Sequence, residues 1–211
     1  MTDSQLAPRK APSQERSRRT VERILAAAAV VFDEAGYAGA TTNDIAREAG
    51  ISIGSLYQYF PHKDALLVEM AHRHVDSVVA ALDAFTASMS SDTVDLDAVL
   101  SDLVDVLVAQ HERDHLHTII AHQAPRTADL ERELDRARGR FIDMADQVLV
   151  ARISDADSRR VAAAMVVAIL DSSVHQVLLH QLPGLQRDYA VTLMLAAVSA
   201  VIDRAASAAC A

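Results

Sequence analysis

The sequence predicts an all-α protein, and two observations support that fold class. Glycine and proline are scarce, with 6 and 5 residues of 211, so few positions force a helix to end. Apolar residues recur at steps of three and four, which is the spacing of one helix face, instead of alternating as they do in a strand. We therefore expect about nine helices and no sheet.

The first helix is expected over about 16–35. Its apolar residues form one stripe from Val21 to Ala35, at three- and four-residue steps. Gly36 follows directly, where a left-handed residue commonly ends a helix. The stripe predicts that one side of this helix packs in a small core.

Two short helices are expected next, over 43–49 and 53–60. A pair of threonines at 41 and 42 precedes the first, and Ser52 precedes the second, so both have residues that favour the N-cap. Gly50 lies in the tight turn between them. Two short helices joined by such a turn are the arrangement of a DNA-binding helix-turn-helix.

Longer helices are expected in the rest of the chain, separated by Ser-Asp-Thr, Pro and Pro-Gly breaks. Their predicted spans are 62–89, 94–112, 115–124, 127–152, 156–181 and 185–207.

The net charge is -9, and the charges are distributed unevenly along the chain. Residues 1–63 hold 8 Lys and Arg against 7 Asp and Glu, whereas residues 64–211 hold 12 against 22. We expect a disordered basic arm over 1–15, a helix-turn-helix domain over 16–63 and a larger helical domain over 64–211. The arm either reaches DNA or is a solvated tail.

The stretch from Thr20 to Leu67 resembles the DNA-binding domain of the TetR family of transcriptional regulators. The resemblance is carried by Ile24-Leu25-Ala26-Ala27-Ala28, Phe32, Gly36-Tyr37, Thr41-Thr42, Ile45-Ala46, Ala49-Gly50-Ile51-Ser52, Gly54-Ser55-Leu56-Tyr57-Gln58-Tyr59-Phe60 and Lys63-Asp64-Ala65-Leu66-Leu67. The run is almost uninterrupted over about a fifth of the chain. The remaining residues match the family only in length and helical character.

The resemblance implies a set of DNA-binding residues. Thr42, Tyr59 and Lys63 would contact the phosphate backbone, and Tyr57 would contact either backbone or bases. The residues implied to lie at the base edges are Asn43, Ile53, Gly54 and Ser55. Ser52 joins the set as the N-cap of the helix over 53–60, which would enter the DNA groove. As isolated residues, Tyr57 and Tyr59 are also readable as core aromatics.

The larger domain is expected to hold a small-molecule effector between its helices, since helix bundles commonly keep pockets there. Each candidate lining residue is equally readable as core. The candidates are Leu103, Leu107, His117, His122, Phe141, Met144, His175 and Leu178.

The last two helices are expected to form a homodimer interface, as they do in the family. Small and apolar residues at helical spacing allow such helices to approach closely. The alternative is that they are buried within one subunit. The predicted interface residues are Val161, Met165, Ala168, Ile169, Ser172, Leu193, Ala196, Ala197, Ala200 and Val201.

A metal site and an enzyme are the alternatives for the larger domain. His111 and His115 are four apart and, with His175 or His180, offer zinc ligands, although helix-end histidines explain the same pattern. There is no Gly-rich phosphate loop or nucleophile elbow. We therefore predict no catalysis, no metal and no cofactor, with an unidentified small-molecule effector as the ligand.

The compartment is expected to be the cytoplasm. Cys210 is the only cysteine, the first 14 residues lack an apolar signal segment, and apolar runs such as 161–170 are too short to cross a bilayer. The predicted function is a homodimeric repressor that binds a palindromic duplex operator and is released by an inducer. The alternative is a TetR-like protein that acts through protein partners without sequence-specific DNA binding.

Overall fold

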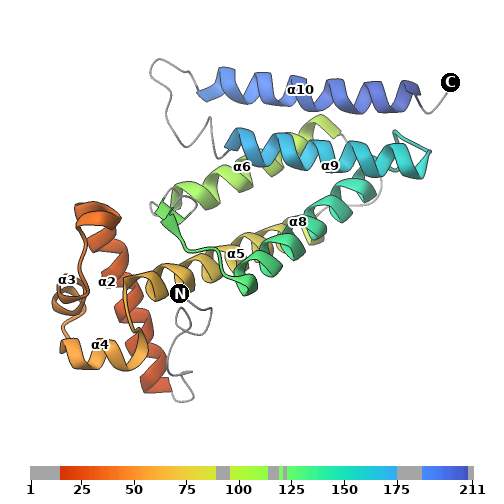
Figure 1. Ribbon diagram of the computed structural model, residues 1–211. Coiled ribbons are helices and arrows are strands. Elements are labelled where there is room, and N and C mark those ends of the chain that lie inside the picture. The colour runs from red at the N-terminus through yellow and green to blue at the C-terminus, as the bar shows by residue number, and fades with distance from the viewer. Residues whose placement is uncertain (1–14, 89–95, 114–118, 121–122, 175–186, 209–211) are drawn as a thin grey trace. The chain divides into compact units, whose positions relative to one another are not determined.

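The computed structural model of the chain describes residues 15–88, 96–113, 119–120, 123–174 and 187–208. This part of the chain is helical, with eight helices and no strand, in agreement with the predicted fold class (Figure 1). The predicted helix over 115–124 lies mostly outside the described residues. The helices are α2 (Glu15–Gly39), α3 (Thr42–Glu48), α4 (Ile53–Tyr59), α5 (Lys63–Ser88), α6 (Leu96–Arg113), α8 (Ala128–Leu149), α9 (Ala156–Ser173) and α10 (Arg187–Ala208).

The chain divides into two compact units. The first comprises Met1–Asp76 and Asp114–Glu133, and the second comprises Ser77–Arg113 and Leu134–Ala211. The first part of α5 therefore packs with the N-terminal helices. The predicted domain boundary after residue 63 falls at the first residue of this helix and stays a prediction.

The core of the first unit is built on the predicted stripe of α2. Ile24, Ala28 and Phe32 have no exposed surface, and Ile45 of α3 and Leu56 of α4 are buried to the same extent. Ala35, which was expected to close the stripe, is exposed. Gly36 has φ 66 and interrupts the helical backbone, so the predicted left-handed residue is present.

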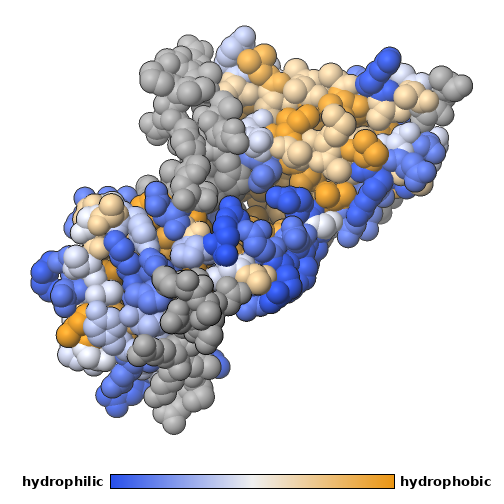
Figure 2. Space-filling view, in the orientation of Figure 1, coloured by the Kyte–Doolittle hydropathy of each residue, from blue (hydrophilic) through white to orange (hydrophobic). Residues whose placement is uncertain are grey.

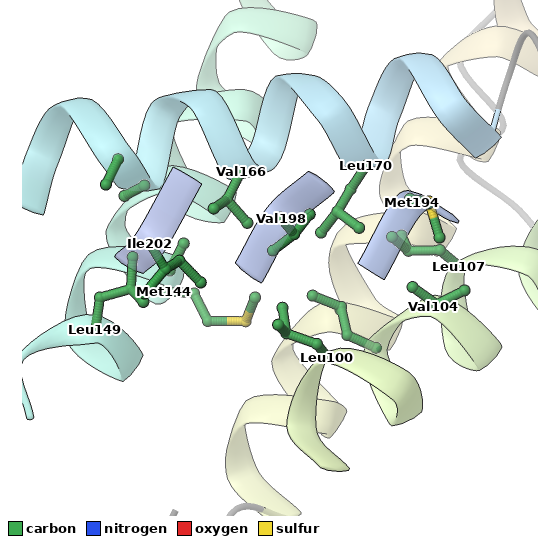
Figure 3. Close-up of a cluster of buried hydrophobic side chains, with 14 of the residues drawn as sticks. Leu100, Val104, Leu107, Met144, Leu149, Val166, Leu170, Met194, Val198 and Ile202 are labelled. Atoms are coloured by element: carbon green, nitrogen blue, oxygen red, sulfur yellow. The ribbon is translucent and has the colours of Figure 1, made fainter. Parts of the chain in front are cut away.

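The core of the second unit is a cluster of aliphatic side chains from α6, α8, α9 and α10. In the close-up, these side chains point toward one another between the four helices (Figure 3). Each fully buried side chain of this kind stabilises the fold by about 1.5–3 kcal/mol relative to exposure. The labelled members are Leu100, Val104, Leu107, Met144, Leu149, Val166, Leu170, Met194, Val198 and Ile202.

Helix α10 is apolar around its circumference. By length and composition alone, Tyr189–Ala208 is sufficient to cross a membrane, which the sequence did not lead us to expect. The core helix of a soluble protein passes the same test, so one such helix is weak evidence. One side of α10, with Met194, Val198 and Ile202, is buried in the core of the second unit.

Candidate nucleic-acid interface

The turn between α3 and α4 is closed by backbone hydrogen bonds. The Gly50 N–H donates to the Arg47 carbonyl at 3.1 Å, and the Ile51 N–H donates to the Ala46 carbonyl at 3.0 Å. These are the two bonds of a Schellman motif, which requires a left-handed residue, and Gly50 has φ 63. The Arg23 guanidinium of α2 also donates to the Gly50 carbonyl, so the turn is fixed to the first helix.

Both short helices begin at the predicted caps. The Thr41 hydroxyl accepts from the Asp44 N–H at 3.2 Å, and the Ser52 hydroxyl accepts from the Ser55 N–H at 3.1 Å. The hydroxyl groups of Ser52 and Ser55 are also hydrogen-bonded to each other, at 2.8 Å. The first turn of α4 therefore presents short side chains at Ser52 and Ser55, with Ile53, around the exposed Gly54.

The carboxylate of Asp44 is held by neighbours on α3. It accepts hydrogen bonds from the Thr41 hydroxyl and the Arg47 guanidinium, and these contacts lower its pKa, with the Thr41 bond as the largest cause. Arg47 therefore offsets the negative charge at the start of this helix.

The two tyrosines of α4 have different surroundings. Tyr57 is 41% exposed, and its hydroxyl lies 3.1 Å from the Thr42 hydroxyl, so it is not a core aromatic. Tyr59 is half-buried, and its hydroxyl accepts from Ser17 of α2 at 3.3 Å. The Tyr57–Thr42 pair places two hydroxyl groups together where α3 and α4 meet.

Lys63 joins α5 to the end of α2. Its ammonium group donates to the carbonyl groups of Tyr37 at 2.7 Å and Ala40 at 3.2 Å, and lies 4.5 Å from the centre of the Tyr37 ring. An ammonium group has three donors, so one remains for a phosphate. Asp64 accepts a hydrogen bond from the Tyr37 hydroxyl. The pKa of Tyr37 is raised mainly by burial, and next by this hydrogen bond and by the negative charge of Asp64.

The predicted DNA-binding residues gather in the first unit, and one further candidate joins them. Asn43 and Gly54 are exposed, and Ile53 and Ser55 are half-exposed. Gln58, which sequence reasoning did not select, is exposed on α4. Gln58 lies four residues after Gly54 and three after Ser55, so it shares a helix face with both. This spacing could have identified Gln58 from the sequence.

The predicted arm lies outside the described residues, except for Glu15 at its end. In the second unit, four of the predicted effector-lining residues belong to or pack against the apolar core: Leu103, Leu107, Phe141 and Met144. The other four, His117, His122, His175 and Leu178, lie outside the described residues.

No group of three or more His, Cys, Asp or Glu side chains that could hold a metal ion occurs in the part of the chain that the structure describes. His111 belongs to α6, while the other histidines considered as zinc ligands, His115, His175 and His180, fall outside that part. The metal alternative therefore rests mainly on residues outside the described part of the chain.

The predicted dimer residues lie on the outer side of α9 and α10. Val161, Met165 and Leu193 are 61%, 48% and 52% exposed, although each is large and apolar. Ala168, Ser172, Ala196, Ala197 and Ala200 are also exposed, whereas Ile169 and Val201 are half-buried against the core. Hydrophobic residues gather over these two helices in Figure 2.

Comparison with known proteins shows which family of domains the first unit resembles. The family model for bacterial regulatory proteins of the tetR family matches residues 24–70, which include both short helices and the turn between them. These residues therefore form a domain of the tetR family. The resemblance drawn from the sequence is thereby confirmed.

Curated relatives of this chain include transcriptional regulators. The transcriptional repressor KstR2 of Rhodococcus jostii is 28% identical over 116 residues, 53% of this chain and 56% of the relative, so the match spans little more than half of that protein. The transcriptional regulator CymR of Pseudomonas putida is 28% identical over 151 residues, 70% of this chain and 73% of the relative.

A solved structure extends the likeness in fold beyond the DNA-binding domain to most of the chain. The transcriptional regulator FadR of Bacillus subtilis, solved in complex with stearoyl-CoA, has a TM-score of 0.56 and 18% identity. The match covers 88% of this chain and 97% of that one. At this identity the likeness concerns the fold alone.

Proposed function

We propose that this TetR-family protein is a repressor that binds a palindromic DNA operator as a homodimer and leaves it when a small molecule binds the second unit. The observation that carries the proposal is the exposed, short-side-chain start of α4, held by a Schellman turn and the Ser52 cap. A B-DNA major groove about 12 Å wide admits such a helix, and short residues let its tip approach the base edges.

The proposed DNA contacts of α3, α4 and α5 fall into two chemical groups. Asn43, Ser55 and Gln58 carry groups that hydrogen-bond to base edges, and Ile53 offers apolar contact to a thymine methyl group. Thr42 and Tyr57 offer paired hydroxyl groups to a phosphate. Tyr59 and the third donor of Lys63 supply further phosphate contacts, and the basic arm would add charge beside them.

The exposed apolar face of α9 and α10 supports the homodimer. Large apolar side chains on one surface of a protein are typical of an interaction site. A two-fold symmetric pair would place two α4 helices in successive major grooves, about 34 Å apart along the duplex. The operator is then a palindrome, and the proposed function places the protein in the cytoplasm, where its DNA is.

The effector is proposed to be apolar. Among the candidate lining residues that the structure describes, Leu103, Leu107, Phe141 and Met144 are all apolar. The solved relative FadR is in complex with stearoyl-CoA, an acyl thioester with a long apolar chain. An effector that lowers operator affinity must itself bind less tightly when DNA is bound, by the same factor.

The decisive experiment is selection of bound DNA from a random duplex pool by the purified protein. The wild type is expected to enrich a palindrome, and the Ser55→Ala/Gln58→Ala variant is expected to lose or change it. Gln147→Ala, which removes an exposed glutamine from α8, is the matched control and should select the wild-type sequence. A folded dimer that enriches no sequence would refute the proposal and favour action through protein partners.

Two further measurements test the response. Stearoyl-CoA is the first probe for release of the selected operator, with free coenzyme A as the control for the headgroup. A reporter gene behind the operator distinguishes repression from activation, because a repressor lowers its expression and an activator raises it.

A further inference from the structure

The two short helices α3 and α4 and the turn between them carry a single cation (Figure 1). Between Ile24 and His62 the only lysine or arginine is Arg47, and the same stretch holds four acidic residues. DNA binding depends strongly on cations, because each phosphate that a protein neutralises releases condensed counterions. Within this stretch, Arg47 is therefore the residue that can supply this contribution.

Arg47 lies on the side of α3 that also carries Asn43. The two residues are four apart, so they share one helix face, and both are exposed. The Arg47 side chain is 78% exposed, whereas Ile45 and Ala46 form the buried side of α3. Four residues correspond to about 6 Å along a helix, which an extended arginine side chain can span. Arg47 can therefore reach a phosphate close to a base that Asn43 contacts.

The guanidinium group of Arg47 is held by Asp44. It donates to one carboxylate oxygen of Asp44 at 2.6 Å, and the other oxygen accepts from the Thr41 hydroxyl at 2.5 Å. These bonds, with the Thr41 bond as the largest cause, lower the pKa of Asp44, so its carboxylate is ionised at neutral pH. An exposed ion pair contributes little to stability, because water screens both charges. Arg47 can therefore leave Asp44 for another anion at small cost.

We propose that Arg47 binds a phosphate of the operator and that Asp44 competes with this phosphate for the guanidinium group. The inference rests on the proposed function, and it adds a contact and an opposing charge to the same interface. A duplex presents many phosphates at once, and an arginine–phosphate pair is charge-assisted and commonly bidentate. Asp44 therefore lowers the affinity for DNA of any sequence, since Arg47 must leave it before the contact forms.

A purely structural role of Arg47 explains less. Arg47 lies in the last turn of α3, where a cation interacts favourably with the helix dipole. That role alone leaves α3 and α4 without a cation for the phosphates, and the nearby Lys63 already donates to two carbonyl groups. The two roles also predict different results, because only a phosphate contact changes the salt dependence of DNA binding.

The first test is the salt dependence of binding to the duplex that the wild type selects, followed by fluorescence anisotropy. Arg47→Met removes the charge and should lower the salt slope by about 0.9 for each subunit bound, whereas Arg47→Lys should keep the wild-type slope. Between about 50 and about 200 mM salt, the advantage of the wild type over Arg47→Met should shrink about 3.5-fold per subunit. The matched control is Arg138→Met, which removes an exposed arginine of α8 that pairs with Asp135 at the same three-residue spacing. It should leave the slope unchanged, and circular dichroism would check that each variant is folded.

The second test is a double-mutant cycle between positions 44 and 47. Asp44→Asn keeps the shape of the side chain and removes its charge. It should raise the affinity for the same duplex several-fold, and by a smaller factor in the Arg47→Met background, where no guanidinium group is released. An equal gain in both backgrounds would show general repulsion of the phosphates and overturn the competition, as would a loss of affinity.

The outcomes separate this inference from the proposed function. A lowered salt slope for Arg47→Met, with the wild-type slope kept by Arg47→Lys and Arg138→Met, supports the phosphate contact. An unchanged slope for Arg47→Met, in a protein that still selects a palindrome, overturns the contact and leaves the proposed function standing. A wild-type protein that binds no duplex at about 50 mM salt, where phosphate contacts are strong, overturns both.

Discussion

Replacing Lys63 by methionine tests how the first unit is held together. The substitution keeps most of the side-chain length and removes the ammonium group that donates to the Tyr37 and Ala40 carbonyls. A hydrogen bond to a charged group contributes about 1.5–3 kcal/mol, and a cation over an aromatic ring contributes about 0.5–1 kcal/mol. Because the site is only half-buried and water can reach the carbonyls, we expect a loss near the lower end of these ranges, about 3.5 kcal/mol in total.

Urea unfolding at fixed protein concentration would measure this loss. The midpoint should fall for Lys63→Met with little change in slope, because the same surface is exposed on unfolding. The concentration must be fixed because a dimer's apparent stability depends on it. Arg152→Met, which removes an exposed cation after α8, is the matched control and should change the free energy of unfolding by less than about 0.5 kcal/mol.

The same variant tests the third donor of Lys63 at a phosphate. If that contact exists, Lys63→Met weakens binding to all sequences and lowers the salt slope of binding by about 1. An unchanged unfolding midpoint would refute the reasoning from the two carbonyl bonds. A lowered midpoint with an unchanged salt slope would show instead that Lys63 positions the reading head without touching DNA.

Three further changes test separate features. Ser55→Ala keeps the hydrogen bond from the residue 55 backbone N–H to the Ser52 hydroxyl. It should change the binding preference at particular base pairs by about 1–3 kcal/mol, measured with operator variants that differ at single base pairs. An equal loss of affinity for every sequence would contradict base reading. Gly50→Ala places a side chain at φ 63 and should lower the free energy of unfolding by about 1–2 kcal/mol, whereas Gly139→Ala, in the middle of α8, should not lower it. Asp155 caps α9, and its hydrogen bonds with Ser158 lower its pKa, so its contribution is present above the ordinary aspartate pKa of about 4 and is lost as the pH falls through the lower folded value. Asp155→Asn should therefore flatten acid unfolding followed by circular dichroism, and an unchanged acid profile would contradict this role.

The sequence predicted the local features of the first unit because their causes are local. The caps Thr41 and Ser52 act on N–H groups three residues away, and Gly50 acts within its own turn. The bonds that fix the reading head are different: Lys63 reaches Tyr37 across 26 residues, and Ser17 reaches Tyr59 across 42. Periodicity carries no information about such pairs, so Lys63 was considered only as a phosphate contact.

The second unit shows a further limit of periodicity. An apolar stripe predicts that a face is covered, but it does not say whether the chain itself or another molecule covers it. On α10, Met194 and Val198 face the core, whereas the adjacent positions Leu193 and Ala197 are exposed. The helical spacing selected Leu193 and Ala197, and the family resemblance assigned them to an interface between subunits. The same all-round apolar character gives α10 the composition of a membrane span.

The hydrogen bonds within α4 restrict what its tip can read. The Ser52 hydroxyl already accepts from the Ser55 N–H, and it shares one hydrogen atom with the Ser55 hydroxyl. If Ser55 donates to Ser52, its free lone pairs accept from cytosine or adenine amino groups; if Ser52 donates, Ser55 keeps a donor for guanine. Ser55 alone is therefore ambiguous between bases. Gln58 has both a donor and an acceptor in one plane, the arrangement that pairs with adenine in a bidentate manner, so under the proposed function it is the residue of α4 that would fix a base identity.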